Sequence, residues 1–141
     1  MEFACKTDTG RLRSHNEDAL FADASASLFI VSDGMGGMNA GEVASKTVVE
    51  ALSGLIKKNL EAYASMSVTD IEEHVRQSLK DLSGHIRSET ENQFGLSGMG
   101  ATVVMALVHN NTAIIASVGD SRAYLVRNGA IYAEGSPREV F

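Results

Sequence analysis

The sequence predicts an α+β domain in which two consecutive helices interrupt a series of strands. Short apolar runs with strand-like patterns occupy the first 35 residues and reappear after residue 100. Between them, apolar residues recur at helical spacing in two segments, Ala44 to Ile56 and Ile71 to Ile86, which residues 61–68 separate. A parallel βαβ unit would instead alternate strand and helix, so this order favours antiparallel strands layered against helices.

The first 35 residues are predicted to form a β-hairpin followed by a loop. Alternation at Phe3, Cys5 and Thr7 is typical of a strand, residues 19–22 suit a short strand, and LFIVS at 28–32 reads as a buried strand. Asp33 is therefore expected at the carboxyl end of a strand, where GMGG follows it.

Two amphipathic helices are predicted next. The first begins at Gly41 and extends for about 17 residues, with Glu42 in its first turn and Lys57 and Lys58 in its last, as the helix dipole favours. Thr69 and Glu72 have the spacing of a capping box for the second helix. Its narrow apolar stripe consists of Ile71, Val75, Leu79, Leu82 and Ile86. Such a helix covers a core from one side.

The last part of the chain is predicted to be an antiparallel meander. The runs ATVVMALV, TAIIASV and RAYLV are separated by HNN and GDS, and RNG at 127–129 has the composition of a hairpin turn before IYAE. Asp120 lies in the second of these connections.

Composition narrows the classes of function. A chain of 141 residues with 44% hydrophobic residues can bury the core of a single domain. Its net charge of -6 disfavours nucleic acid as a partner. The single cysteine, Cys5, excludes an intrachain disulfide, and no apolar run is long enough for a membrane span. We expect a soluble, cytoplasmic protein with no membrane partner.

Acidic residues at strand ends indicate a metal site. Neither a G-x-S-x-G elbow nor a phosphate-binding glycine motif is present, and Cys5 has no histidine close in sequence to activate it as a thiolate nucleophile. Carboxylates without supporting histidines or cysteines suit Mg²⁺ or Mn²⁺ better than zinc. The acidic residues in question are Glu17, Asp18, Asp33 and Asp120.

Arg13 and Gly34 complete this candidate set. Arg13 presents a planar cationic group that matches phosphate, and Gly34 has no Cβ to keep a backbone carbonyl from the same ion. Carboxylates for metals with one arginine for an anion are the side chains of a metal-dependent phosphoester hydrolase. Each residue also has an ordinary explanation, because D-G turns, surface arginines and turn-capping aspartates are common.

Four stretches resemble, in order and spacing, the successive motifs of the PPM or PP2C family of metal-dependent protein serine/threonine phosphatases, and in particular its bacterial branch. These stretches are RLRSHNEDAL at 11–20, VSDGMGGMNAGEVAS at 31–45, SGMGATVVMALV at 97–108 and ASVGDSRAYLVRNG at 116–129. The resemblance implies a PP2C-like β-sandwich flanked by helices in α-β-β-α layers, with a dinuclear Mn²⁺ or Mg²⁺ site at one end.

The resemblance also implies roles for individual residues. Arg13 would bind the substrate phosphate, and Asp33 with the Gly34 carbonyl would contact the paired metals. Glu17 and Asp18 would hold the metals or their waters. Asp120 would serve a third, weaker metal site. Met35 stands where some relatives have a histidine as candidate general acid, so the resemblance identifies no general acid here.

The resemblance covers only the N-terminal portion of the family's domain. After Gly129 the family's two later metal-binding aspartates are not matched, so residues 1–141 are predicted to be a phosphatase domain that is incomplete at its C-terminal end. With part of the ligand set, metals should bind weakly. Both sheets would lack strands, and their open edges could pair with another chain to form an oligomer.

Two functions follow from these observations. The first is hydrolysis of phosphoserine and phosphothreonine esters in a protein substrate by a metal-activated water, in opposition to a serine/threonine kinase. The second is a catalytically deficient relative that acts as a binding or regulatory module, or a remnant without function. The missing motifs favour the second, and the intact N-terminal motifs favour the first.

Overall fold

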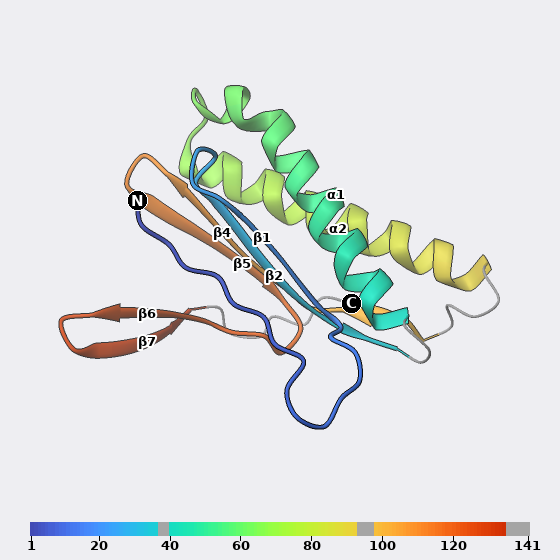
Figure 1. Cartoon of the computed structure of the whole chain (residues 1–141). Helices are drawn as coiled ribbons and strands as arrows, with labels where there is room; N and C mark the ends of the chain where they lie inside the picture. Colours follow the sequence, from blue (N-terminus) through green and yellow to red (C-terminus); the bar gives the residue numbers. More distant parts are fainter. Residues whose placement is uncertain (37–39, 93–97, 135–141) are drawn as a thin grey trace.

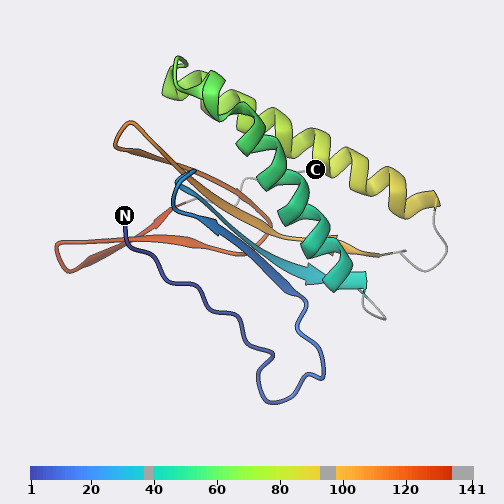
Figure 2. The same ribbon diagram turned by 45° about the horizontal axis from the view of Figure 1, so that its top comes forward.

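The computed structural model describes residues 1–36, 40–92 and 98–134 and confirms the predicted α+β architecture (Figure 1). The elements in chain order are β1 Asp18–Asp23, β2 Leu28–Met35, α1 Ala40–Tyr63, α2 Val68–Asn92, β3 Gly100–Ala101, β4 Val103–His109, β5 Thr112–Val118, β6 Ala123–Arg127 and β7 Ala130–Glu134. Both helices lie on the same face of the larger sheet (Figures 1 and 2).

The larger sheet is antiparallel and has the order β1-β2-β4-β5, with β3 paired to the end of β2. Strands β6 and β7 form a separate two-stranded sheet that extends away from the helices (Figure 1). The predicted meander is therefore wrong between β5 and β6, which do not pair. The chain turns out of the larger sheet at Gly119, whose φ of +91° favours glycine.

The hairpin turn predicted at residues 127–129 is confirmed, and the HNN connection in the predicted meander forms a turn of the same kind. Asn110 and Asn111 connect β4 to β5 with φ values of 46° and 66°, and Asn128 and Gly129 connect β6 to β7 with values of 54° and 76°. Positive φ at both central residues is what a type I′ hairpin turn requires, and asparagine and glycine adopt it at low cost. These short-range signals could be read directly from the sequence.

The N-terminal segment differs from its prediction. Residues 1–9 form no strand, although residues 3, 5 and 7 alternate as a strand would. The Phe3 ring packs on Phe29 of β2 at a centroid distance of 5.4 Å, while Cys5 is exposed. The N-terminal segment thus contacts the face of the sheet opposite the helices through the Phe3 ring. Its backbone forms no strand there.

Strand β2 is longer than predicted. Its pairing with β3, Gly34 with Ala101 and Met35 with Gly100, continues the strand past Asp33. Asp33 therefore lies within β2 and not after it. Gly34 and Met35 were expected in a loop, but pairing with a strand far along the chain keeps these two residues extended. Residues 37–39 of the same motif lie outside the described residues.

Both helices have different limits from those predicted. Helix α1 has 24 residues because its final turns also reach the core, where Tyr63 is buried. Helix α2 is capped two residues earlier than expected: the Asp70 amide donates to the Ser67 hydroxyl, which donates to the Asp70 carboxylate. Thr69 with Glu72 is not the cap. Among the described residues, neither helix is long and apolar enough to cross a membrane.

The core lies between the larger sheet and the two helices. Its most buried side chains come from β2 and β4, one face of α1 and the apolar stripe of α2; they include Leu28, Ile30, Met105, Leu52, Ile56, Ile71 and Val75. Burial of such side chains stabilises the fold by about 1.5–3 kcal/mol each. The alternation that buries Leu28 and Ile30 leaves Val31 and Asp33 on the other face.

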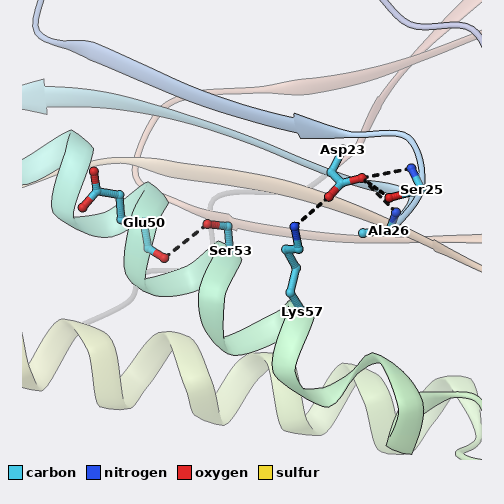
Figure 3. A network of polar contacts seen from close by, with 6 residues as sticks. All are labelled: Asp23, Ser25, Ala26, Glu50, Ser53 and Lys57. Carbon is cyan, nitrogen blue, oxygen red and sulfur yellow. Dashed lines mark hydrogen bonds and ion pairs between the residues drawn. The ribbon is translucent and has the colours of Figure 1, made fainter.

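Asp23 connects the turn after β1 to α1 (Figure 3). Its carboxylate accepts hydrogen bonds from the Ser25 amide and hydroxyl and from the Ala26 amide, and it forms an ion pair of 2.9 Å with Lys57 of α1. The Lys57 ammonium also lies 5.6 Å from the centroid of the Phe21 ring. This contact aligns the β1–β2 hairpin with the helix that covers it.

Candidate metal centre

Two of the predicted site residues, Asp18 and Asp33, meet across the first hairpin. Asp18 begins β1 and is the register partner of Asp33 in β2. Antiparallel partners project from the same face of a sheet with Cβ atoms roughly 5 Å apart. Both side chains are exposed, on the face opposite the helices. The strand register therefore brings together two carboxylates that are 15 positions apart in the sequence.

The raised pKa of Asp18 indicates that the Asp18 and Asp33 carboxyl groups interact. Burial raises the pKa of Asp18, and the charge of Asp33 and a side-chain hydrogen bond with Asp33 raise it further. Arg13 acts in the opposite direction and Glu17 in the same direction. A hydrogen bond between two carboxyl groups requires that one of them hold a proton. A cation between them would remove that requirement, because it attracts both charges.

Glu17 holds the loop before β1 against the start of α1. Its carbonyl oxygen accepts hydrogen bonds from the Gly34 amide at 3.1 Å and from the Ser45 hydroxyl at 2.6 Å. Its side chain lies against Gly41, since a Cβ added there would be 2.8 Å from Glu17 Oε1. The backbone of Glu17 is thus a structural joint, and its carboxylate stands at the amino end of α1.

Gly34 is required by packing. A Cβ added to Gly34 would lie 2.0 Å from the Gly41 carbonyl oxygen and 2.7 Å from the Glu17 carbonyl oxygen. Backbone atoms occupy that space, so no side chain fits. The absence of a Cβ at this position therefore serves the close approach of α1 to β2. The predicted contact of the Gly34 carbonyl with a metal stays a prediction.

Arg13 lies beside the acidic residues but already has a partner. Its guanidinium nitrogen Nη1 is 3.7 Å from Glu17 Oε2, and 71% of the Arg13 side chain is exposed. An exposed ion pair of this length contributes little to stability. Arg13 can therefore exchange Glu17 for an anionic ligand at small cost.

Asp120 lies in a turn that the adjacent residue Ser121 attaches to the same end of the sheet. It is exposed in the turn after β5, between Gly119 and Ser121. The Ser121 hydroxyl lies 2.6 Å from the hydroxyl of Thr102, which accepts a hydrogen bond from the Asp33 amide. The turn is therefore attached to the Asp33 strand. Its carboxylate does not line the described cleft that contains Asp18 and Asp33.

That cleft has a volume of about 280 Å³. Besides Asp18 and Asp33 it is lined by Lys6 and Thr7 of the N-terminal segment and by Ser121 of the turn. It is open on the face of the sheet opposite the helices. A cleft of this kind can admit an ion with its waters, and its only described carboxylates are the two register partners.

Sequence reasoning missed the polar residues that hold the carboxylates in place. The Asn16 side chain donates to the Thr7 hydroxyl at 2.6 Å and accepts from the Asp18 amide at 3.1 Å. Thr102 and Ser121 connect Asp33 to the turn. Their positions inside the NED, MGAT and GDSR stretches were the available signal. Because hydroxyl and amide side chains are uncharged, nothing in the sequence distinguished these residues from ordinary turn residues.

Across 1–36, 40–92 and 98–134, no three or more acidic, histidine or cysteine side chains lie together as a metal-binding group. The donor chemistry of Asp18 and Asp33 fits a hard cation such as Mn²⁺ or Mg²⁺. Such an ion binds more oxygen ligands than two carboxylates supply, so water and backbone oxygens would have to provide the remaining ligands. The described residues thus fit one side of a metal site.

A comparison with known protein families shows which family this chain belongs to. The family model for protein phosphatase 2C matches residues 11–139. The chain belongs to the protein phosphatase 2C family. The resemblance carried by the four sequence motifs is thereby confirmed.

Curated members of the protein phosphatase 2C family align with most of this chain. The serine/threonine phosphatase stp of Listeria welshimeri is 39% identical over 129 residues, which are 89% of this chain and 50% of that protein. The serine/threonine protein phosphatase PstP of Mycobacterium tuberculosis is 33% identical over 135 residues, which are 93% of this chain and 24% of that protein. The chain spans about half the length of the Listeria relatives it matches.

Solved structures of the protein phosphatase 2C family share the fold. Stp1 of Staphylococcus aureus matches with a TM-score of 0.77 at 38% identity, over 94% of this chain and 52% of that one. The catalytic domain of PstP, in complex with two manganese ions, matches with a TM-score of 0.77 at 32% identity, over 94% of this chain and 54% of that one. The fold described above is therefore the corresponding part of the family's fold.

Proposed function

We propose that this chain supplies the Asp18–Asp33 side of a dinuclear Mn²⁺ or Mg²⁺ site in a protein serine/threonine phosphatase. The observation that carries the proposal is the register pairing of these two aspartates in a cleft at the end of the sheet. Family membership and the two manganese ions of the PstP catalytic domain support it. When bound, such cations act as Lewis acids in the hydrolysis of a phosphoester.

The chain's own residues have distinct tasks in this proposal. Asp18 and Asp33 bind the cations, with Glu17 and the Gly34 carbonyl at the margin of the site. Arg13 leaves its exposed contact with Glu17 and orients the phosphate of a phosphoserine or phosphothreonine substrate. Asp120 serves a further, weaker cation from the turn after β5. A serine/threonine kinase would have phosphorylated the substrate protein.

Binding of Mn²⁺ to the 141-residue chain tests the metal part of this proposal. We expect binding by isothermal titration calorimetry that weakens at least about tenfold in Asp33→Asn, because removing a carboxylate lowers the charge and number of the ligands. Glu61→Gln is the matched control: Glu61 is exposed on α1 and lies outside the cleft. Equal affinity of wild type and Asp33→Asn would contradict the assignment.

Hydrolysis of a phosphothreonine peptide tests the catalytic part. We expect release of phosphate that requires Mn²⁺, stops with a chelator and is lost in Asp33→Asn. In Arg13→Met we expect KM to rise, because the substrate loses its cationic partner while the carboxylates stay in place. Lys58→Met, on the exposed surface of α1, is the control for loss of one positive charge.

A noncatalytic binding or regulatory module is the second candidate function. The observation that favours it is the absence, among the described residues, of a third acidic side chain beside the aspartate pair. A chain of this kind would bind Mn²⁺ weakly and release no phosphate. Metal-dependent turnover that disappears in Asp33→Asn would exclude it.

A further inference from the structure

Thr102 lies at the break between β3 and β4, opposite Asp33. The pairs Val31–Val104 and Gly34–Ala101 follow one register, which places Asp33 opposite Thr102 between them. On its other side the β4–β5 register, which pairs Val103 with Val118, continues by one residue to place Thr102 opposite Gly119. Thr102 therefore stands between the strand that carries Asp33 and the turn that carries Asp120.

The hydrogen bonds at this position depart from a regular ladder. In an antiparallel hydrogen-bonded pair the two residues exchange N–H···O=C bonds in both directions. The Thr102 amide does donate to the Asp33 carbonyl, at 2.8 Å. The Asp33 amide, however, donates to the Thr102 hydroxyl at 3.0 Å, and the Thr102 carbonyl accepts from the Ser32 hydroxyl at 2.7 Å. A side-chain oxygen thus replaces a backbone oxygen next to Asp33.

The same hydroxyl reaches the turn on the other side. Thr102 Oγ1 lies 2.6 Å from Ser121 Oγ, one residue after Asp120. The methyl group of Thr102 fills the space in front of Gly119, where an added Cβ would lie 2.9 Å from Thr102 Cγ2. Thr102 is only 3% exposed. Its hydroxyl is thus a buried bridge between strand β2 and the turn after β5, and water is a poor substitute for either partner.

We infer that Thr102 is a positioning residue that sets Asp33 and the Asp120 turn in a fixed relation through its hydroxyl. This role requires an oxygen that accepts from one side and bonds to a second hydroxyl on the other, so valine cannot replace it although its shape is nearly the same. Serine keeps the oxygen and loses only the methyl group. The consequence for metal binding rests on the proposed function, whereas the bridge itself does not.

The bridge is tested first in protein without added metal. In Thr102→Val we expect amide hydrogen exchange of Asp33, measured by NMR relative to the core amide of Met105, to accelerate about fivefold, as for the loss of one hydrogen bond. The amide resonances of Asp120 and Ser121 should shift as well. Thr102→Ser should retain the wild-type exchange rate. Unchanged exchange of Asp33 in Thr102→Val would overturn the inference.

Two further variants separate the bridge from general stability. Ser121→Ala removes the second half of the bridge only, so the turn resonances should shift while Asp33 exchange stays at the wild-type rate. Ser78→Ala removes another buried hydroxyl, which bonds within α2 to the His74 carbonyl, and should change neither signal. Equal effects of Ser78→Ala and Thr102→Val would show a general loss of stability and would contradict the positioning role.

Mn²⁺ affinity tests the consequence. We expect Thr102→Val to weaken binding about tenfold or more, as is typical for partners that orient metal ligands, and Thr102→Ser to restore it. Wild-type affinity in Thr102→Val, together with accelerated Asp33 exchange, would contradict a role in the site. Failure of the wild-type chain to bind Mn²⁺ would overturn the proposed function instead, and the exchange experiment would still decide whether Thr102 forms the bridge.

Discussion

Asp18 and Asp33 face each other across the β1–β2 register, and the charge of Asp33 contributes to the raised pKa of Asp18. Like charges on opposing strand positions destabilise a sheet. This pair lies at the end of a hairpin whose remaining register pairs, from Ala19 with Ser32 to Asp23 with Leu28, contain no second pair of like charges. The unfavourable contact is therefore local to the proposed metal site.

Removing one charge of this pair should lower the pKa of Asp18. In metal-free Asp33→Asn we expect the carboxyl pKa of Asp18, measured by carbon-13 NMR titration, to move toward its ordinary value of 3.8. The free energy of unfolding at neutral pH should rise by at most about 0.5 kcal/mol, since both side chains are exposed. The gain should shrink as pH falls through the raised pKa of Asp18, because its protonation already removes the repulsion.

Glu61→Gln is the control for this titration, since it removes an exposed negative charge from α1 without altering the pair. An identical Asp18 pKa in wild type and Asp33→Asn would show that burial alone causes the shift. It would also remove the electrostatic reason to place a cation between the two carboxylates.

Replacing Gly34 should be among the most damaging substitutions in the chain. In Gly34→Ala the new methyl group would meet backbone atoms of Gly41 and Glu17, which cannot move without separating α1 from β2. We expect a loss of about 3 kcal/mol or more in urea unfolding. The matched control is Gly54→Ala in α1, where nothing lies within 4 Å of the added carbon. That change should stabilise the helix by about 0.5–1 kcal/mol.

If Gly34→Ala unfolds at the same urea concentration as wild type, α1 can lie farther from β2 without a loss of stability. The joint between Glu17, Gly34 and Gly41 would then have no role in stability.

Asp23 should make stability depend on pH. Hydrogen bonds from Ser25, Lys57 and the Ala26 amide hold the pKa of Asp23 well below its usual range. The stabilisation is therefore present above the unfolded-state value of 3.8 and is lost as pH falls below it toward the lowered folded-state pKa. We expect Asp23→Asn to unfold at lower urea than wild type at about pH 7, with a smaller difference at about pH 3.

Lys57→Met separates the two contributions at Asp23. It removes the ion pair, keeps an apolar stem beside Phe21 and leaves the hydrogen bonds of the turn intact. A pH dependence that persists in Lys57→Met would assign the effect to the turn, and one that disappears would assign it to the ion pair. A constant difference between Asp23→Asn and wild type at both pH values would contradict the prediction.

Local patterns predicted much of this fold. The asparagine and glycine turns at Asn110–Asn111 and Asn128–Gly129, the apolar run of β2 and the helical spacing of α1 and α2 depend on neighbours in sequence, and each appears in the structure. The errors arose where distant partners decide. Pairing with β3 extended β2 past Asp33, burial of Tyr63 extended α1, and Phe3 contacts the sheet without joining it.

The sequence by itself determined the family and the kinds of residue available for a metal site, because motif order and side-chain chemistry depend only on which residues stand at which positions. Only the tertiary structure decided that Asp18 meets Asp33, that Gly34 is needed by the approach of α1, and that Thr102 connects Asp33 to the Asp120 turn. The physical reason is strand register. A shift of one residue would turn Asp33 toward the helices, and no local pattern around Asp33 specifies which distant residues become its partners.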